Sequence, residues 1–259
     1  MQKDKIIVYG LHPLIEAIKA KKTINKLFLQ KGMKMYSSAY QKLIFLSKKE
    51  NIPIQVVPEN KFIKLNNKNH QGVFAILSPI KTYQITNLLP IFYKKKRNPI
   101  LIILDRITDV RNFGSIIRTS ACAGVDAIIV PNKETAMIGS DSIKTSSGAL
   151  FKVPICKEKN IKNTIFFLIK YGFKIVSATT EKKSNMYSYN IDFSGPIALI
   201  FGNEEKGISS KYLKISNEKV KIPIKGGISS LNVSVAFGII LYEIIRQRKS
   251  IDDPPKIHF

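Results

Sequence analysis

Hydrophobic residues along the chain form short runs that alternate with segments of helical periodicity. In the first 80 residues, the runs Ile6–Tyr9, Lys26–Leu29, Ile54–Val57 and Val73–Leu77 read as strands, and helical patterns lie between them. The runs Ile100–Leu104 and Ile197–Phe201 are apolar throughout, as in strands that are buried within a sheet. Alternation of this kind is typical of α/β proteins. We therefore expect a small N-terminal α/β domain and a larger C-terminal one.

A cation-rich stretch separates these two parts of the chain. Residues 91–98 read Ile-Phe-Tyr-Lys-Lys-Lys-Arg-Asn and lie between Pro90 and Pro99. Prolines on both sides of a run of like charges are typical of a connecting segment, which is either a solvated tether or a segment that follows a phosphate backbone. The predicted organisation is an N-terminal domain in residues 1–80, a linker in residues 81–98 and a second domain in residues 99–259.

The stretch 220–248 contains several different sequence patterns in succession. A short apolar strand ends before two glycines, and the cap-forming residues Ser229, Ser230 and Asn232 then precede an almost wholly apolar helix. The helix closes on cations, which complement the negative end of its dipole. Small polar side chains and free backbone groups thus face a glycine turn. This arrangement either caps a buried helix or binds a ligand.

The charge balance points to a polyanionic partner. The chain carries 42 Lys and Arg against 18 Asp and Glu, a formal net charge of +24 at pH 7, and nucleic acid is the simplest partner for such a chain. The excess of Lys also matches drift towards A/T-rich codons, so part of the charge need not concern binding. Only six of the cations are Arg, yet Arg106, Arg111 and Arg118 lie close together. Such a cluster indicates work that needs a planar guanidinium group.

Several other classes of site lack support in the sequence. No apolar run approaches the about 20 residues that span a bilayer, and no secretory signal is apparent, so we expect a cytoplasmic protein. Cys122, Cys156 and three scattered His show no metal-ligand spacing, and we expect no metal site. No G-x-G-x-x-G follows a predicted strand, and the glycines at 202 and 207 lack the Lys and Ser/Thr of a P-loop. Dinucleotide binding and nucleotide hydrolysis are therefore not expected.

Three segments of the C-terminal half together form a specific pattern. Asp105–Arg118 contains Asn-x-Gly-x-x-x-Arg, Leu199–Gly207 contains Gly-x-Glu-x-x-Gly after a strand, and Ile222–Ser234 contains Ile-Pro, Gly and Ser-Leu-Asn-Val-Ser. In this order they resemble the SpoU family of the SPOUT superfamily, the RNA 2′-O-ribose methyltransferases. Tyr9–Ala17 and His70–Val73 look like the substrate-recognition domain of the subgroup that methylates a guanosine ribose in large-subunit ribosomal RNA.

The resemblance implies a fold and a cofactor. The C-terminal domain would be a parallel sheet with a deep trefoil knot, and the N-terminal domain a small α/β unit that recognises the substrate. S-adenosylmethionine would be the methyl donor, held against the backbone of Gly202, Ile222 and Leu231. A glycine permits close backbone approach, and Pro223 stiffens the neighbouring turn. A homodimer would complete the active site, with the C-terminal helix at its interface.

The resemblance also assigns catalytic roles. A ribose 2′-hydroxyl is a poor nucleophile at neutral pH, so its proton must be drawn off while its oxygen is held in line with the donor methyl. By resemblance Arg118 takes this part, and we expect it to steer the hydroxyl and stabilise the developing oxyanion as much as to take the proton. Asn112, which could also cap the helix that carries Arg118, would orient these groups together with Glu204, Ser230 and Asn232.

The predicted function is therefore methylation, by S-adenosylmethionine, of a guanosine ribose in large-subunit (23S) ribosomal RNA. A transfer-RNA ribose methyltransferase of the same family is the closest alternative, and the separate N-terminal domain stands against it. A non-catalytic RNA-binding protein is an alternative of another class. The intact Gly202, Glu204 and Ser230-Leu231-Asn232 argue against that alternative.

Overall fold

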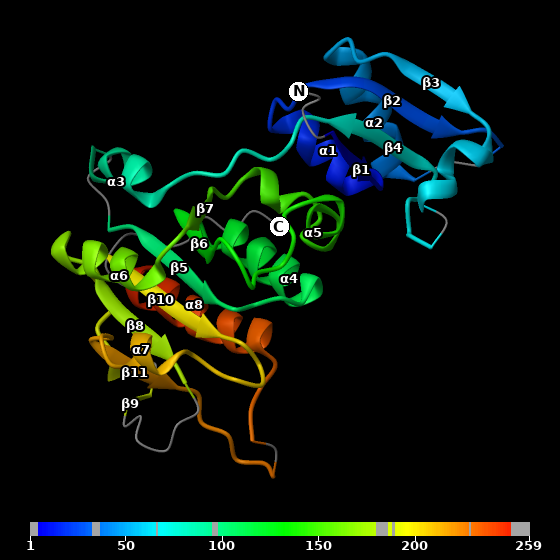
Figure 1. Ribbon diagram of the computed structural model, residues 1–259. Coiled ribbons are helices and arrows are strands. Elements are labelled where there is room, and N and C mark those ends of the chain that lie inside the picture. Colours follow the sequence, from blue (N-terminus) through cyan, green and yellow to red (C-terminus); the bar gives the residue numbers. More distant parts are fainter. Residues whose placement is uncertain are drawn as a thin grey trace. The chain divides into compact units, whose positions relative to one another are not determined.

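The computed structural model describes residues 5–32, 37–65, 67–94, 98–179, 186–187, 190–227 and 229–249. The chain divides into two compact units, whose elements are drawn in Figure 1. Unit 1 consists of Met1–Lys81 and Met137–Lys152, and unit 2 of Thr82–Ala136 and Val153–Phe259. Each unit has a sheet of its own.

Unit 1 is built on a four-stranded mixed sheet. Its strands are β1 (Ile6–Tyr9), β2 (Ile24–Gln30), β3 (Ile54–Val57) and β4 (Val73–Leu77), in the order β1-β4-β2-β3. Strand β4 pairs antiparallel with β1 and β2, whereas β2 and β3 are parallel. The helices are α1 (Leu11–Lys19), α2 (Ser38–Lys49) and the 3-10 helix η1 (Glu59–Leu65). The four strands predicted in this part of the sequence are confirmed.

Helix α1 and the 3-10 helix η1 both bury apolar side chains in unit 1. Leu14 and Ile15 of α1 are buried. Phe62 of η1 meets Phe74 of β4 edge to face, with ring centroids 4.9 Å apart, and Phe28 stacks on Phe74 at 4.6 Å. Aromatic pairs of this kind contribute roughly 0.5–1.5 kcal/mol beyond their buried area. Strand β4 is accordingly buried along most of its length.

Residues 137–152 belong to unit 1 although they lie in the C-terminal half of the sequence. They form helix α5 (Ser140–Thr145) and the 3-10 turn η2 (Ala149–Phe151). The Tyr9 hydroxyl donates to Asp141 at 2.6 Å, across 132 residues of sequence. Gly148 lies so close to α1 that an added Cβ would sit 2.7 Å from the Cβ of Glu16. The N-terminal strand and helix are thus completed by a distant segment of the chain.

Unit 2 contains a seven-stranded sheet whose neighbouring strands are all parallel. The order β7-β6-β5-β10-β8-β11-β9 is made of β5 (Ile100–Asp105), β6 (Ala127–Pro131), β7 (Ile155–Glu158), β8 (Lys174–Ala178), β9 (Met186–Tyr187), β10 (Ile197–Gly202) and β11 (Glu218–Lys221). The helices are α3 (Ile85–Lys94), α4 (Val110–Cys122), α6 (Ile161–Lys170), α7 (Ser210–Leu213) and α8 (Val233–Lys249). The predicted α/β class and the buried strands β5 and β10 are confirmed.

Part of the segment predicted as a linker is a packed helix. Ile85, Leu89 and Phe92 of α3 are buried in a core that α6, α7 and the sheet also form. Their spacing of four and three residues is that of a helical stripe. In the sequence this stripe is obscured by Pro90 and by the cation run that follows. Residues 95–97, the centre of that run, lie outside the described residues.

The end of helix α8 is fixed by Arg248. Its guanidinium donates to the main-chain oxygens of Phe193 at 2.9 Å, Asn98 at 2.6 Å and Gly195 at 2.5 Å. Burial lowers the pKa of Arg248, and the three carbonyl groups accept one hydrogen bond from each of its three nitrogens. The sequence predicts that a cation here complements the helix dipole. The structure adds a more specific task, in which one planar side chain binds three separate carbonyls.

Candidate active site

The carboxyl ends of β5 and β10 meet at one edge of the unit 2 sheet. The two strands are parallel neighbours, and Gly202 lies opposite Asp105 in their register. The loops that follow these strands therefore leave the sheet side by side, one leading to α4 and the other to α7. In open parallel sheets ligands bind at the carboxyl ends of the strands. The polar segments that the sequence singled out lie at this edge.

Helix α4 begins at Asp109. The Oδ1 atom of Asp109 accepts hydrogen bonds from the backbone amides of Arg111 at 2.9 Å and Asn112 at 2.7 Å, which is an N-cap arrangement. The prediction that Asn112 caps this helix is therefore wrong, and Asn112 lies in the first turn. Its side chain crosses to the other loop instead, where Nδ2 donates to Oε1 of Glu204 at 2.5 Å.

Glu204 links Asn112 to Asn232. The Nδ2 atom of Asn232 lies 3.0 Å from Oε1 of Glu204 and 3.0 Å from Oδ1 of Asn112. The Oδ1 atom of Asn232 accepts from the backbone amide of Ser234 at 2.9 Å and from its hydroxyl at 2.6 Å. Asn232 thereby caps α8, as the sequence predicts, and its amide group is held in one orientation. One residue from each of the three motifs thus joins a single hydrogen-bonded cluster.

The turn after β10 is closed by its own backbone. The amide of Gly207 donates to the main-chain oxygen of Asn203 at 2.8 Å, and Oδ1 of Asn203 accepts from two further amides of the turn, each at 3.0 Å. A Cβ added to Gly202 would lie 2.3 Å from the carbonyl carbon of Gly207. The sequence explains this glycine by close approach of a donor molecule. In the structure the chain's own backbone, at Gly207 and Ile208, lies close to Gly202.

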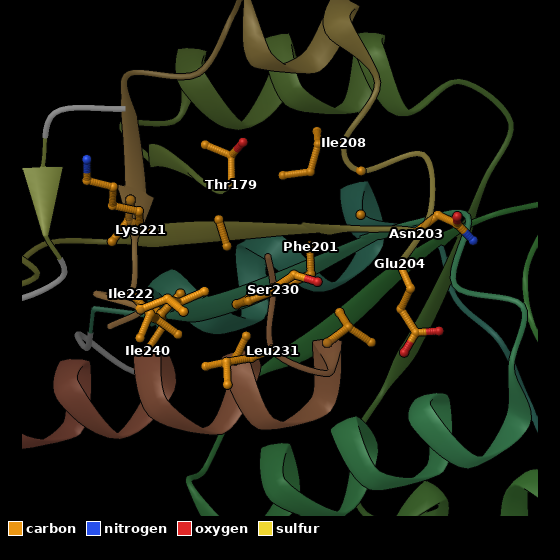
Figure 2. A pocket seen from close by; sticks show the side chains of 17 residues that line it. Thr179, Phe201, Asn203, Glu204, Ile208, Lys221, Ile222, Ser230, Leu231 and Ile240 are labelled. Atoms are coloured by element: carbon orange, nitrogen blue, oxygen red, sulfur yellow. The ribbon is translucent and has the colours of Figure 1, made fainter. Parts of the chain in front are cut away.

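A pocket opens beside this turn. It lies between the turn, the segment after β11 and the first turns of α8 (Figure 2). Counted together with the open space at its mouth, it measures about 740 Å³. Ile222, Leu231 and Ile240 contribute apolar surface on one side, and Glu204 stands at the opposite side (Figure 2). The predicted site residues that line it are Gly202, Glu204, Ile222, Ser230 and Leu231.

Arg118 does not line this pocket. It is exposed on α4, two turns beyond Asn112. Arg111, Ser115 and Cys122 are exposed on the same stripe of the helix, at intervals of four, three and four residues. The structure therefore brings together seven of the eight predicted site residues at the pocket or in the cluster beside it. The role of Arg118 stays a prediction.

Several residues that line the pocket were not singled out by the sequence. Phe201 lies in a strand that is apolar throughout, and Ile240 lies in the largely apolar first part of a helix. Nothing in the sequence separates such residues from the core. Thr179 comes directly after β8, and Lys221 ends β11. Their position at the carboxyl ends of parallel strands is the signal that could have identified them.

Other kinds of reactive site lack support in the described part of the chain. Among these residues no group of three or more His, Cys, Asp or Glu is arranged to hold a metal ion. Burial raises the pKa of Cys156 to about 12, so this thiol is protonated at neutral pH. No helix within the described ranges is long and apolar enough to cross a membrane.

Comparisons with known proteins give a consistent result. The model of the SpoU rRNA Methylase family matches residues 99–242, and that of the RNA 2'-O ribose methyltransferase substrate binding family matches residues 7–83. A putative TrmH family tRNA/rRNA methyltransferase from Staphylococcus epidermidis is 32% identical over 250 residues, which cover 96% of this chain and 99% of that protein. The match to the SpoU rRNA Methylase family alone covers more than half of the chain.

Solved structures share the fold. The SpoU methyltransferase AviRb from Streptomyces viridochromogenes, crystallised in complex with AdoMet, is 22% identical with a TM-score of 0.77, covering 95% of this chain and 91% of that one. An AdoMet-bound rRNA methyltransferase from Sinorhizobium meliloti is 23% identical with a TM-score of 0.75, covering 93% and 87%. The two family models and the 32% identical relative together define an RNA methyltransferase. The chain belongs to the SpoU rRNA methylase family.

The two glycines of the turn should respond differently to alanine. Gly202→Ala should lower the free energy of unfolding by about 3 kcal/mol or more, because the added methyl meets backbone that cannot rotate away. Gly207→Ala should cost only about 1–2 kcal/mol, because it has open space and only its left-handed φ of 63° opposes a side chain. Urea unfolding measures both values. Equal losses would contradict the close contact between Gly202 and the turn.

Proposed function

We propose that the protein transfers a methyl group from S-adenosylmethionine to the ribose 2′-hydroxyl of a guanosine in large-subunit (23S) ribosomal RNA, in the cytoplasm. The observation that carries the proposal is the cluster of Asn112, Glu204 and Asn232 beside the pocket at the carboxyl edge of a parallel sheet. Family membership supports the reaction class. The net charge of +24 and the match of residues 7–83 to a substrate-binding family support an RNA substrate.

The residues of the pocket fit the proposed donor. S-adenosylmethionine supplies an electrophilic methyl group on a positively charged sulfur, and it carries a flat adenine and polar ends. Apolar surface at Ile222, Leu231 and Ile240 suits a flat ring, and the carboxylate of Glu204 suits a cation. Gly202, Ile222 and Leu231 all line the pocket, and we expect their main-chain groups to contact the donor. These three residues are accordingly the proposed donor contacts.

The chain's own side chains would prepare the ribose hydroxyl. We assign to Arg118 the task of steering this hydroxyl and stabilising the oxyanion that develops as its proton leaves. Asn112, Glu204 and Asn232 form a preorganised set of amide and carboxylate groups that orients the ribose and the donor. Ser230, whose exposed side chain lies at the pocket, would complete this set.

A homodimer would bring Arg118 to a pocket. In one chain Arg118 is exposed and does not line the pocket. Helix α8 buries one side in its own unit, yet Val235, Ile239 and Tyr242 are exposed at intervals of four and three residues. Such an apolar stripe indicates an interaction surface. We propose that two copies pair through this stripe, so that Arg118 of one subunit serves the donor pocket of the other.

The nature of the RNA is tested by deleting the gene and mapping 2′-O-methylation in ribosomal and transfer RNA. Loss of one guanosine methylation in large-subunit RNA is the expected result, and loss confined to transfer RNA would overturn the choice of substrate.

Calorimetry with S-adenosylmethionine separates an enzyme from a non-catalytic RNA-binding protein. A folded sample without measurable binding would end the enzyme proposal.

Arg118→Lys should keep the charge but lose the planar fork. We expect turnover of RNA to fall by about 100-fold or more, the effect of losing an oxyanion donor, while the donor dissociation constant stays unchanged. Single-turnover transfer from radiolabelled donor measures this. Arg111→Lys is the matched control, since Arg111 is exposed on the same stripe of α4, and it should retain most turnover. Near-normal transfer by Arg118→Lys would remove the assigned role.

Ile239→Asp should convert the dimer to a monomer and abolish transfer, because it places a charge in the apolar stripe of α8. Phe166→Asp on α6 is the control: Phe166 is 48% exposed and Ile239 44%, so the two changes are alike except in location. Sedimentation velocity gives the oligomeric state. A dimer that survives Ile239→Asp, or one lost equally in both variants, would refute this interface.

A further inference from the structure

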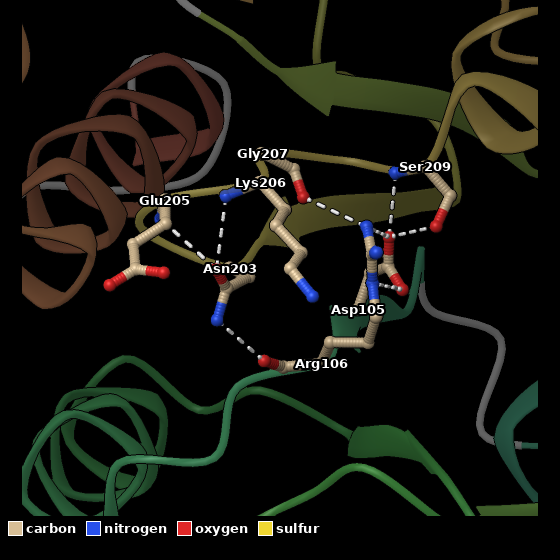
Figure 3. Close-up of polar contacts among 7 residues, drawn as sticks. All are labelled: Asp105, Arg106, Asn203, Glu205, Lys206, Gly207 and Ser209. Carbon is tan, nitrogen blue, oxygen red and sulfur yellow. Dashed lines mark hydrogen bonds and ion pairs between the residues drawn. The ribbon is translucent and has the colours of Figure 1, made fainter.

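Asp105 is a buried carboxylate that the proposed reaction does not use. It ends strand β5, and its side chain is only 5% exposed. A buried charge is costly unless it is paired. Oδ2 of Asp105 accepts from the backbone amide and from the hydroxyl of Ser209, each at 2.7 Å. Arg106 donates to the same carboxylate from Nε at 3.1 Å and from Nη2 at 3.2 Å. Figure 3 shows these contacts.

The side chain of Ser209 bonds to Asp105 and does not cap its own helix. It occupies the N-cap position of α7, where a serine hydroxyl normally accepts a hydrogen bond from a helix amide. Here the side chain makes no capping hydrogen bond, and its hydroxyl donates to Asp105 instead. The far end of the turn that follows β10 is thus tied to the end of β5.

Arg106 adds two further ties to the same turn. Its Nη2 atom donates to the main-chain oxygen of Gly207 at 3.2 Å, and its own main-chain oxygen accepts from Nδ2 of Asn203 at 3.2 Å (Figure 3). To do so Arg106 adopts a left-handed φ of 61°, which is unfavourable for a residue with a side chain. The contacts of a planar fork with a carboxylate and a carbonyl stabilise this backbone conformation.

The turn held in this way carries one wall of the pocket. Asn203, Glu204 and Gly207 line the pocket; Arg106 ties Asn203 and Gly207, and Glu204 lies between these two points. Glu204 must accept from Asn112 at 2.5 Å and from Asn232 at 3.0 Å with one oxygen atom. A shift of the turn by a fraction of an ångström would disturb these bonds and the pocket together.

We propose that Arg106 is a positioning residue for the donor site. Through a clip formed by Asp105, Arg106 and Ser209, it holds the turn 203–209 in the shape that binds the donor. This inference rests on the proposed function, because it takes the pocket as the donor site. Of the clustered arginines, Arg106 therefore contacts the protein's own turn at the donor pocket and does not contact the RNA.

Arg106→Lys tests the clip by donor affinity. The variant keeps a cation but cannot bind the carboxylate and the carbonyl as a fork, so S-adenosylhomocysteine should bind about tenfold more weakly in calorimetry without RNA. In transfer assays the KM for the donor should rise while kcat at saturating donor changes little. Lys211→Ala is the control, because it removes a cation two residues after Ser209 and leaves the clip intact. Unchanged affinity in Arg106→Lys would overturn the proposal.

Ser209→Ala provides a second variant in case Arg106→Lys fails to fold. It removes one hydroxyl from the clip and keeps the backbone amide. Because both variants act through Asp105, their effects on the dissociation constant should be less than multiplicative when combined. Fully multiplicative effects would show that the two residues act separately and would overturn the clip.

Amide exchange separates this inference from the proposed function. In the absence of any donor, the amide of Gly207, which bonds to Asn203, should exchange faster in Arg106→Lys than in the native protein and Lys211→Ala. If native protein binds no S-adenosylhomocysteine, the proposed function fails, while exchange still tests the clip. If the amide of Gly207 in Arg106→Lys exchanges at the rate of the native protein, the clip is overturned.

Discussion

The parallel pairing of β5 with β10 is the interaction on which the site depends. Their register sets Gly202 opposite Asp105, and both loops of the site leave the sheet from these two residues. Because side chains alternate between the faces of a strand, a shift of one residue would turn Asp105 away from Ser209 and change the loop that carries Glu204. All residues of β5 and all residues of β10 before Gly202 are buried, so separating the two strands would expose apolar surface.

Much of the site could be read from the sequence because its residues belong to short motifs that follow buried strands or open helices. The strand β10 and the cap of α8 are legible as an apolar run and as Asn232 before a helix. The contacts of Glu204 and Asn232 with Asn112 depend on the tertiary fold, and only the resemblance to a known family could predict them. The same motifs misled where two residues compete for one role. Asp109 and Asn112 are both good N-caps, and local sequence does not decide between them.

Other features that the sequence does not reveal have a common physical cause. The apolar stripe of helix α3 at Ile85, Leu89 and Phe92 is short and stands next to a cation run, so the sequence predicts part of a linker there. The sequence accounts for Gly202 by a ligand alone, because close approach of the chain's own backbone leaves no mark in the sequence. In both cases the deciding partner is distant in sequence, so only the folded chain reveals it. Arg106 and Arg248 likewise bind groups about a hundred residues or more away, at Gly207 and Asn98.

The composition of unit 1 has a consequence for how the chain is made. Residues 137–152 complete the packing of the N-terminal strand and helix, and Ile143 and Leu150 are almost fully buried there. On the ribosome the N-terminus emerges first, and domains generally begin to fold as they emerge. Here the first 81 residues leave that surface uncovered until residue 152 has been synthesised. An expressed fragment that stops at the family boundary near residue 83 would keep the same apolar surface exposed permanently.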